Sequence, residues 1–391
     1  MSYHNHQFQT RIINTGEGFS ALKKEWNDLL HQSSWDTLFL TWEWQFSWWE
    51  SFGGELFIVL VFENKTLVGI LPFIKIRRLF LHVLKFIGTV DSDYLDFIIK
   101  KGFEKEIVSF FFNVFLKNHP GIEIIELESI NERSPHFQYI SHVFPNDYFS
   151  IETKEKICAF LDLPGSWEQY LSSLSSNMRY YIRRKEKKIK KECDVCIGIE
   201  NNKKHLQTRM THFFEQHQKR WNRLERPGAF FSEPFKEFHK NVSKRFFEAG
   251  FLRLYYLELN NRPVASYYLF KYQKTVHFYL TGFDPEYRQF SPSVVLLTHV
   301  VKDAIDQGLD EFDFMREAYD YKLKWNPRTR INRSFTIIKH KSSAKFYVLL
   351  VCILRKCAER IKRLLPSRSK LIIRKLLPRR IVNSFDPFFR E

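Results

Sequence analysis

A short polar turn between two apolar segments, at residues 282–293, combines residue types that suit chemistry. The pattern predicts a strand, a tight turn and then a helix, whose first N–H groups have no acceptor within the helix. Because the helix dipole adds partial positive charge at the same end, the turn favours an anion such as a pyrophosphate. The turn contains Arg288, then Ser291 three residues later and Ser293 after two more.

A histidine and a carboxylate lie on the two strand-like segments that flank this helix. His277 alternates with apolar neighbours, so it shares one face of its strand with Tyr279. Histidine titrates near neutrality and is able to act as a base in a cleft, although a sheet histidine can also be purely structural. Asp313 faces opposite to Phe312 and Phe314. It is either a functional carboxylate or one that bonds the local backbone.

The elements that must position these residues alternate between helix and strand patterns. The second half is expected to contain, in order, helices at 203–223 and 234–249, a hairpin formed by 251–259 and 264–271, a strand at 275–283 and a strand at 310–315. The first half carries a similar hairpin, formed by 56–62 and 67–76. This weak internal repeat favours two related α/β modules.

Motifs spread over residues 35–335 resemble the CelD/FemAB-like branch of the GNAT superfamily, in which two GNAT-like modules stand side by side. The matching residues are Trp42-Glu-Trp44, Trp48-Trp49, Ser92-Asp-Tyr-Leu-Asp96, Ser176-Asn-Met-Arg179, Arg183-Arg184, residues 282–288, Ser291-Pro-Ser293, Phe312-Asp-Phe314, Tyr321-Lys322 and Trp325. The chain departs from the family pattern where two glycines of the turn are serines. It departs again at Glu317, Ala318 and Tyr319, where the family commonly has Gly-Asp-Glu.

The resemblance implies an α/β fold with a mixed sheet, made of tandem GNAT-like acyl-CoA N-acyltransferase modules. The first module is expected at residues 1–150 and would shape the acceptor cleft. The second, at 151–340, would bind the acyl donor and carry the catalytic groups. A basic amphipathic tail is expected at 341–391.

The resemblance also implies roles for individual residues. Arg288, Ser291 and Ser293 would hold the pyrophosphate of an acyl-CoA, most simply acetyl-CoA. Asp313, Tyr321 and Lys322 would serve the acceptor and the proton transfers, and Glu317 would replace the acidic residue that the family commonly has nearby. The candidates for substrate binding are Trp48, Tyr94, Asp96, Arg179 and His277.

Positive charge is concentrated in two segments. Residues 341–391 contain 14 Lys/Arg and 3 Asp/Glu, which gives +11 of the net charge of +17. Apolar stripes beside basic faces predict that residues 343–380 contact an anionic membrane surface; the alternative is a packed terminal helix. Residues 177–191 predict a basic helix that either binds polyphosphate, an acidic carrier protein or RNA, or is simply solvated.

Length and composition limit the number of domains, the cysteine chemistry and the location of the protein. A chain of 391 residues suggests two domains, and 44% hydrophobic residues argue against general disorder. Five cysteines form no obvious disulfide framework. Cys193 and Cys196 have zinc-like spacing without a second ligand pair, so no metal site is predicted. With no secretory signal in the sequence, the predicted location is the cytoplasm, on the inner face of the membrane if the tail binds lipid.

The predicted function is therefore transfer of an acyl group, most simply acetyl, from acyl-CoA to an amine of a sugar, an amino acid or an envelope precursor. One alternative shares the fold: a FemAB-type transferase that uses aminoacyl-tRNA and a peptidoglycan precursor, the one case in which a nucleic acid is expected. The other is a non-catalytic adaptor that keeps the fold and uses the tail as a membrane anchor.

Overall fold

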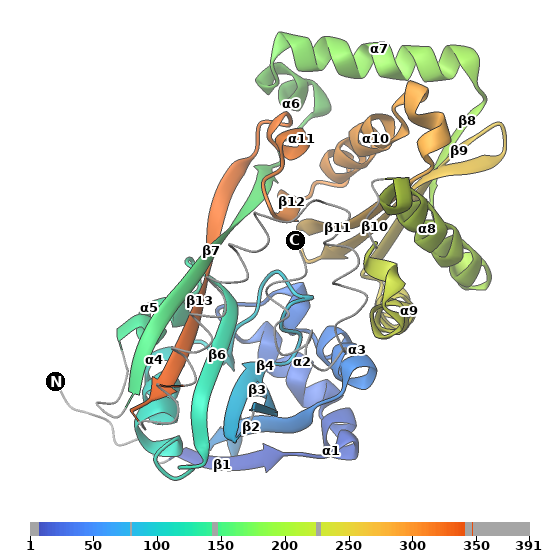
Figure 1. The fold of residues 1–391 in the computed structure, drawn as a ribbon. Helices are drawn as coiled ribbons and strands as arrows, with labels where there is room; N and C mark the ends of the chain where they lie inside the picture. The colour runs from blue at the N-terminus through green and yellow to red at the C-terminus, as the bar shows by residue number, and fades with distance from the viewer. Residues whose placement is uncertain (1–7, 79, 143–147, 224–227, 341–345, 347–391) are drawn as a thin grey trace.

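The computed structural model describes residues 8–78, 80–142, 148–223, 228–340 and 346 (Figure 1). The tail predicted at 341–391 lies outside the described residues, except for Phe346. Within the described residues, no helix combines the length and the apolar character needed to cross a membrane.

One mixed sheet of 13 strands runs through both halves of the chain. The strands of the first half are β1 (Phe8–Ile13), β2 (Glu55–Glu63), β3 (Thr66–Arg78), β4 (Leu81–Phe86), β5 (Ile98–Ile99) and β6 (Ile122–Asn131). The others are β7 (Tyr148–Asp162), β8 (Val195–Ile199), β9 (Leu252–Leu259), β10 (Arg262–Tyr272), β11 (Thr275–Phe283), β12 (Glu311–Arg316) and β13 (Arg328–Lys339). Their order is β1-β2-β3-β4-β6-β13-β7-β12-β11-β10-β9-β8, and β5 pairs with β3.

The last strand, β13, lies between β6 of the first half and β7. It pairs antiparallel with both strands, and β7 continues past it to pair with β12. Figure 1 shows β7 and β13 as long neighbouring strands that connect the two halves of the molecule. The module boundary predicted at residue 150 falls inside β7.

Each half contains one parallel strand pair next to an antiparallel hairpin. In the first half β4 runs parallel to β6, and in the second β11 runs parallel to β12. The β11–β12 pairing covers only three positions and ends at His277 and Asp313. Beyond these residues the two strands no longer pair, which opens the sheet between them.

The helices cover both faces of the sheet (Figure 1). They are α1 (Gly16–Ala21), α2 (Lys23–His31), α3 (Trp42–Phe52), α4 (Glu104–Phe110), α5 (Pro135–His142), α6 (Trp167–Ser173), α7 (Ser176–Glu192), α8 (Lys203–Arg223), α9 (Glu233–Glu248), α10 (Pro292–Asp306) and α11 (Asp320–Leu323). Short 3-10 or π turns occur at η1 (Leu38–Leu40), η2 (Phe111–Phe115), η3 (Ala229–Phe231) and η4 (Pro285–Phe290). The mixed α/β fold predicted from the sequence is confirmed.

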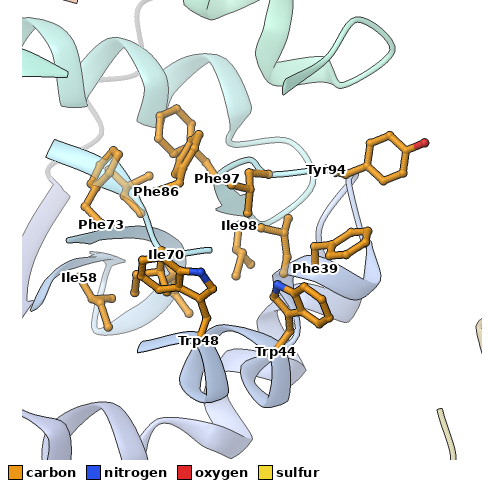
Figure 2. Close-up of a cluster of buried hydrophobic side chains, with 14 of the residues drawn as sticks. Phe39, Trp44, Trp48, Ile58, Ile70, Phe73, Phe86, Tyr94, Phe97 and Ile98 are labelled. Carbon is orange, nitrogen blue, oxygen red and sulfur yellow. The ribbon is translucent and has the colours of Figure 1, made fainter. Parts of the chain in front are cut away.

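The tryptophan-rich helix α3 joins the cores of the two halves. Trp44 is fully buried, and its ring lies 5.0 Å from that of Phe238 on α9. Figure 2 shows Trp44 and Trp48 beside the apolar side chains of the first half. Tyr94 lies at the edge of this cluster with its hydroxyl directed away from it. The first half therefore contributes polar groups to the junction as well as apolar packing.

Helix α8 lies very close to β11 because position 282 is a glycine. A Cβ atom at Gly282 would lie 2.7 Å from the backbone nitrogen of His217 on α8, closer than real side chains come. The close approach brings the basic C-terminal half of α8 next to the turn that follows β11.

Candidate active site

The end of the β11–β12 pairing forms the centre of the candidate site. His277 and Asp313 are register partners there, and both are buried. His277 Nδ1 lies 3.7 Å from Asp313 Oδ2, which is too long for a hydrogen bond. This nitrogen has no hydrogen-bond partner among the described residues. We call this pair, where the strands separate, the apex.

Arg330 on β13 fixes the carboxylate of the apex. Its guanidinium lies 2.6 Å from Asp313 Oδ2 and 2.7 Å from Glu311 Oε1, and its Nε donates to the Tyr94 hydroxyl at 2.9 Å. Burial alone would raise the pKa of Asp313, but Arg330 and the neighbouring His277 lower it to about 2. Asp313 is therefore an anion bound to Arg330. Sequence reasoning missed Arg330, because nothing in the local pattern of β13 marks it.

A second ion pair connects the first half to the end of β12. Arg316 Nε lies 2.9 Å from Asp93 Oδ1, and the Arg316 N–H donates to Asp93 Oδ2 at 3.0 Å. Lys322 donates from Nζ to the Arg316 carbonyl at 2.7 Å. Burial lowers the pKa of the Lys322 ammonium. This hydrogen bond of Lys322 thus connects α11 to the end of β12.

The predicted anion-binding turn lies at the N-terminus of α10. Ser291 is the residue before the helix and has a left-handed backbone, with φ of 53° and ψ of 50°. This conformation is the one that favours glycine, which explains the glycine expected here from the family pattern. The Ser293 N–H is in the first turn of α10 and has no intrahelical acceptor, and the Ser293 carbonyl accepts from the Tyr267 hydroxyl at 2.5 Å.

Cations from two other helices surround this turn. Lys219 on α8 lies 2.7 Å from Asp284, and Arg223 donates to the Pro285 carbonyl at 3.2 Å. Arg220 donates to Thr281 Oγ1 on β11 at 3.1 Å. Lys188 on α7 reaches the Gln289 carbonyl at 3.5 Å. Arg288 itself is exposed. It is therefore only one of several positive charges near the turn.

Glu317 directly follows β12, and Tyr321 lies on α11. Burial raises the pKa of the Tyr321 hydroxyl to about 12, although the residue is 42% exposed. Arg220 of α8 and Glu317 act electrostatically on the same hydroxyl. The Glu317 carboxylate accepts a hydrogen bond from the Tyr319 hydroxyl.

A cavity of about 130 Å³ lies on the other side of the apex. It is bounded by the N-terminal ends of β11 and β12, by β13, and by the segment that follows α2. Its lining residues are Trp35, Asp36, Thr37, Tyr94, Asn131, Tyr272, Gln273, Thr275, His277, Glu311 and Arg330. His277 thus belongs both to the apex and to the wall of the cavity.

The structure brings some of the predicted site residues together and separates others. Tyr94, His277 and Asp313 meet at the apex. Trp48 is buried and donates to Asp91 at 2.8 Å, Asp96 is buried 2.9 Å from His136 Nδ1, and Arg179 donates to the carbonyl of Leu174 near the end of α6. None of these three residues lines the cavity, so their substrate-binding roles stay predictions. The described residues contain no group of three or more potential metal ligands.

A comparison with known protein families finds a match in this part of the chain. Residues 176–323, which include the splayed strands, the turn and α10, match the family of the acetyltransferase (GNAT) domain. This part of the chain is therefore similar to a GNAT domain. No curated protein matches the chain by sequence.

Solved structures resemble the chain well beyond the GNAT domain. FemX is 11% identical, with 84% of this chain and 96% of that chain covered and a TM-score of 0.58. A conserved protein of unknown function from Bacteroides thetaiotaomicron VPI-5482 is 10% identical, covers 85% and 100%, and has a TM-score of 0.56. The C-terminal domain of a putative lysylphosphatidylglycerol synthetase from Agrobacterium fabrum is 11% identical, covers 85% and 95%, and has a TM-score of 0.50.

At such identities these likenesses concern the fold. They cover most of the chain, so the likeness in fold includes the first half. The resemblance to the CelD/FemAB-like branch is confirmed at the level of the fold, and the family match of residues 176–323 indicates acyltransferase activity in general.

Proposed function

We propose that the protein transfers an acyl group, most simply acetyl, from acyl-CoA to an amine of a sugar, an amino acid or an envelope precursor. The observation that carries this proposal is the apex, which stands between the turn before α10 on one side and a polar cavity on the other. A thioester held along the splayed strands and an amine held in the cavity would meet at His277.

The donor side suits a phosphorylated thioester. The first turn of α10 offers the Ser293 N–H to a phosphate, and Arg288, Arg220 and Lys188 add positive charge around it. Beyond His277, β11 has no strand partner on the side of β12 among the described residues, and its backbone groups there suit the amide groups of a pantetheine arm. The donor would then place its carbonyl carbon at the apex.

The acceptor side supplies a proton acceptor. His277 Nδ1 has no hydrogen-bond partner among the described residues, so it is available to take the proton of the attacking amine. The C–N bond forms while the C–S bond breaks, and the leaving thiolate takes a proton from the Tyr321 hydroxyl. That hydroxyl carries its proton at neutral pH, as any tyrosine does, and burial raises its pKa further, to about 12. The Asp313 carboxylate, 3.7 Å from His277 Nδ1, would stabilise the imidazolium that forms.

A calorimetric titration of the full chain with acetyl-CoA, a long-chain acyl-CoA and CoA tests the donor. Binding should weaken roughly tenfold in Arg288→Ala and in Arg220→Ala, as expected for a lost charged hydrogen bond. Arg11→Ala, which changes an exposed arginine on β1, is the matched control and should bind as the wild type does. Failure of all three ligands to bind would refute the acyl-CoA donor.

A second donor is favoured by the fold likeness to FemX and to a lysylphosphatidylglycerol synthetase domain. An aminoacyl-tRNA would need a larger basic surface than CoA does. Helix α7 presents exposed Arg183, Arg184, Lys187, Lys190 and Lys191 beside the donor turn. Co-purification of tRNA that is released by salt, together with absent acyl-CoA binding, would establish this donor instead.

A further inference from the structure

We propose that the cavity at the apex binds an amine carried on a hydroxylated ring, that is, an amino sugar, and does not bind an amino acid with a free carboxylate. This inference rests on the proposed function and narrows its acceptor. It is carried by unpartnered polar atoms, by the charge of the lining and by the aromatic walls of the cavity.

Three lining side chains have buried polar atoms without a hydrogen-bond partner among the described residues. They are Trp35 Nε1, Thr37 Oγ1 and His277 Nδ1. A buried polar group left unpaired costs about 1–3 kcal/mol, so such groups normally meet a ligand or ordered water. The indole N–H only donates, and the threonine hydroxyl donates as well as accepts. Both therefore suit the hydroxyl oxygens of a ligand.

The charge of the lining disfavours an acidic ligand. Among the described lining residues, Arg330 is the single Lys or Arg, and it is already engaged. Its guanidinium contacts Glu311 Oε1 at 2.7 Å and Asp313 Oδ2 at 2.6 Å, while Nε bonds Tyr94. A ligand carboxylate or phosphate would have no free cation there and would face Asp36 and Glu311.

The carboxylates of Asp36 and Glu311 are compatible with a positively charged amine. Asp36 is held in place, because its Oδ1 accepts from the Tyr272 hydroxyl at 2.6 Å and its Oδ2 from the Gln273 amide at 2.5 Å. Asp36 comes from the first half and Tyr272 from the second, so the two halves form this wall together. An ammonium group would be attracted here, and it would release one proton to water before the neutral amine attacks.

The lining and the volume of the cavity suit one ring. Trp35, Tyr94 and Tyr272 supply aromatic surface, and Asn131, Thr275 and Gln273 add amide and hydroxyl groups. A few placed polar groups among aromatic walls are usual in small-molecule pockets. The volume of about 130 Å³ is many times the ~10–15 Å³ that a single water needs. The space therefore exceeds what a bridging water would fill.

Binding of acceptors to the full chain, measured calorimetrically without donor, tests the inference. The probes are 2-amino-2-deoxyglucose, glucose and serine, which carry respectively an amine with ring hydroxyls, hydroxyls alone, and an amine with a free carboxylate. The amino sugar should bind more tightly than glucose by several-fold, and serine should not bind. Serine binding as tightly as the amino sugar would overturn the inference.

Single substitutions test whether the amino sugar binds in the cavity. Thr37→Val removes the hydroxyl at nearly constant shape and should weaken amino-sugar binding about three- to tenfold, the range expected for one neutral hydrogen bond. Thr10→Val, on exposed β1, is the control and should change nothing. If Thr37→Val does not fold, Trp35→Phe removes the other donor and gives the same test. Equal binding by Thr37→Val and the control would refute the site.

A parallel titration with acetyl-CoA separates this inference from the proposed function. Acetyl-CoA binding without amino-sugar binding would overturn the inference and leave the donor assignment standing. If the amino sugar binds in a way that depends on Thr37 but acetyl-CoA does not bind, the cavity is supported as the amino-sugar site. The same result would refute acetyl-CoA as the donor.

Discussion

Arg330 on β13 and Asp313 on β12 form a 2.6 Å ion pair, in which Asp313 is fully buried and the Arg330 side chain is 12% exposed. The two strands are not neighbours, since β7 lies between them along the sheet. The pair therefore crosses β7 and connects the end of the described chain to the apex. It also holds Tyr94 of the first half in place.

Removing Arg330 should destabilise the protein strongly. Arg330→Met leaves Asp313 and Glu311 without their shared cation, and breaking a buried ion pair in this way costs about 3–5 kcal/mol. Arg328→Met is the matched control on the same strand, because the Arg328–Asp162 pair is 66% and 58% exposed. Its cost should stay below about 1 kcal/mol. Denaturant unfolding of both variants measures the difference, and equal losses would contradict the importance given to the buried pair.

Two buried histidines should make the fold sensitive to mild acid. Burial lowers the pKa of His217 to about 3 and that of His239 well below its usual value. Both are uncharged in the folded state at neutral pH, whereas the unfolded chain takes up protons below about pH 6.5. Stability is therefore complete above about pH 6.5 and falls as the pH decreases from there towards 3, by up to about 1.4 kcal/mol per pH unit for each group.

The variant His217→Gln tests this pH dependence, because glutamine retains an acceptor for the Trp221 N–H, which lies 3.0 Å from His217 Nε2. Its free energy of unfolding should fall less steeply between pH 6.5 and 5 than that of the wild type. His82→Gln changes an exposed histidine and should leave the wild-type slope unchanged. A wild-type slope in His217→Gln would show that this histidine is not responsible.

The left-handed backbone at Ser291 predicts opposite responses to two substitutions. Ser291→Gly should keep the stability within about 1 kcal/mol, since glycine adopts this conformation freely. Ser291→Val should lower it by about 1–2 kcal/mol or more, because a β-branched residue is strained there. Thermal unfolding measures both, with Ser293→Val in the helical first turn as the control. If valine were tolerated equally at both positions, the turn would have a different conformation.

The basic tail gives a prediction that rests on the sequence alone. Removal of residues 343–391 should abolish sedimentation with vesicles that contain anionic lipid, because most of the net positive charge lies in the tail. Circular dichroism of the truncated chain should remain that of the folded protein. Binding to neutral vesicles serves as the control, and undiminished sedimentation with anionic vesicles would refute a membrane role for the tail.

Local sequence patterns predicted the elements that are defined by residues close together in the sequence. Helix α8 and strand β11 begin and end where their periodicity places them, and the donor turn lies at a helix N-terminus as expected. The apolar faces of these elements repeat with a clear period, so no distant contact is needed to define them.

The parts of the site that come from distant segments were not predictable in this way. Arg330 lies on a strand rich in charged residues, and its position depends on pairing with strands from both halves. Asp36 and Tyr272 meet although 236 residues separate them. Strand order and register of this kind are set by tertiary packing, so the cavity became visible only in the folded structure.

The place of β13 in the sheet also constrains the order of folding. Strand β6 emerges from the ribosome about 200 residues before its neighbour at residues 328–339. Until then the first half has an unpaired edge, which is the kind of surface that invites association with other chains. A pairing between such distant segments also predicts slow folding. The two halves of this protein should therefore become stable together, once residues 328–339 have been synthesised.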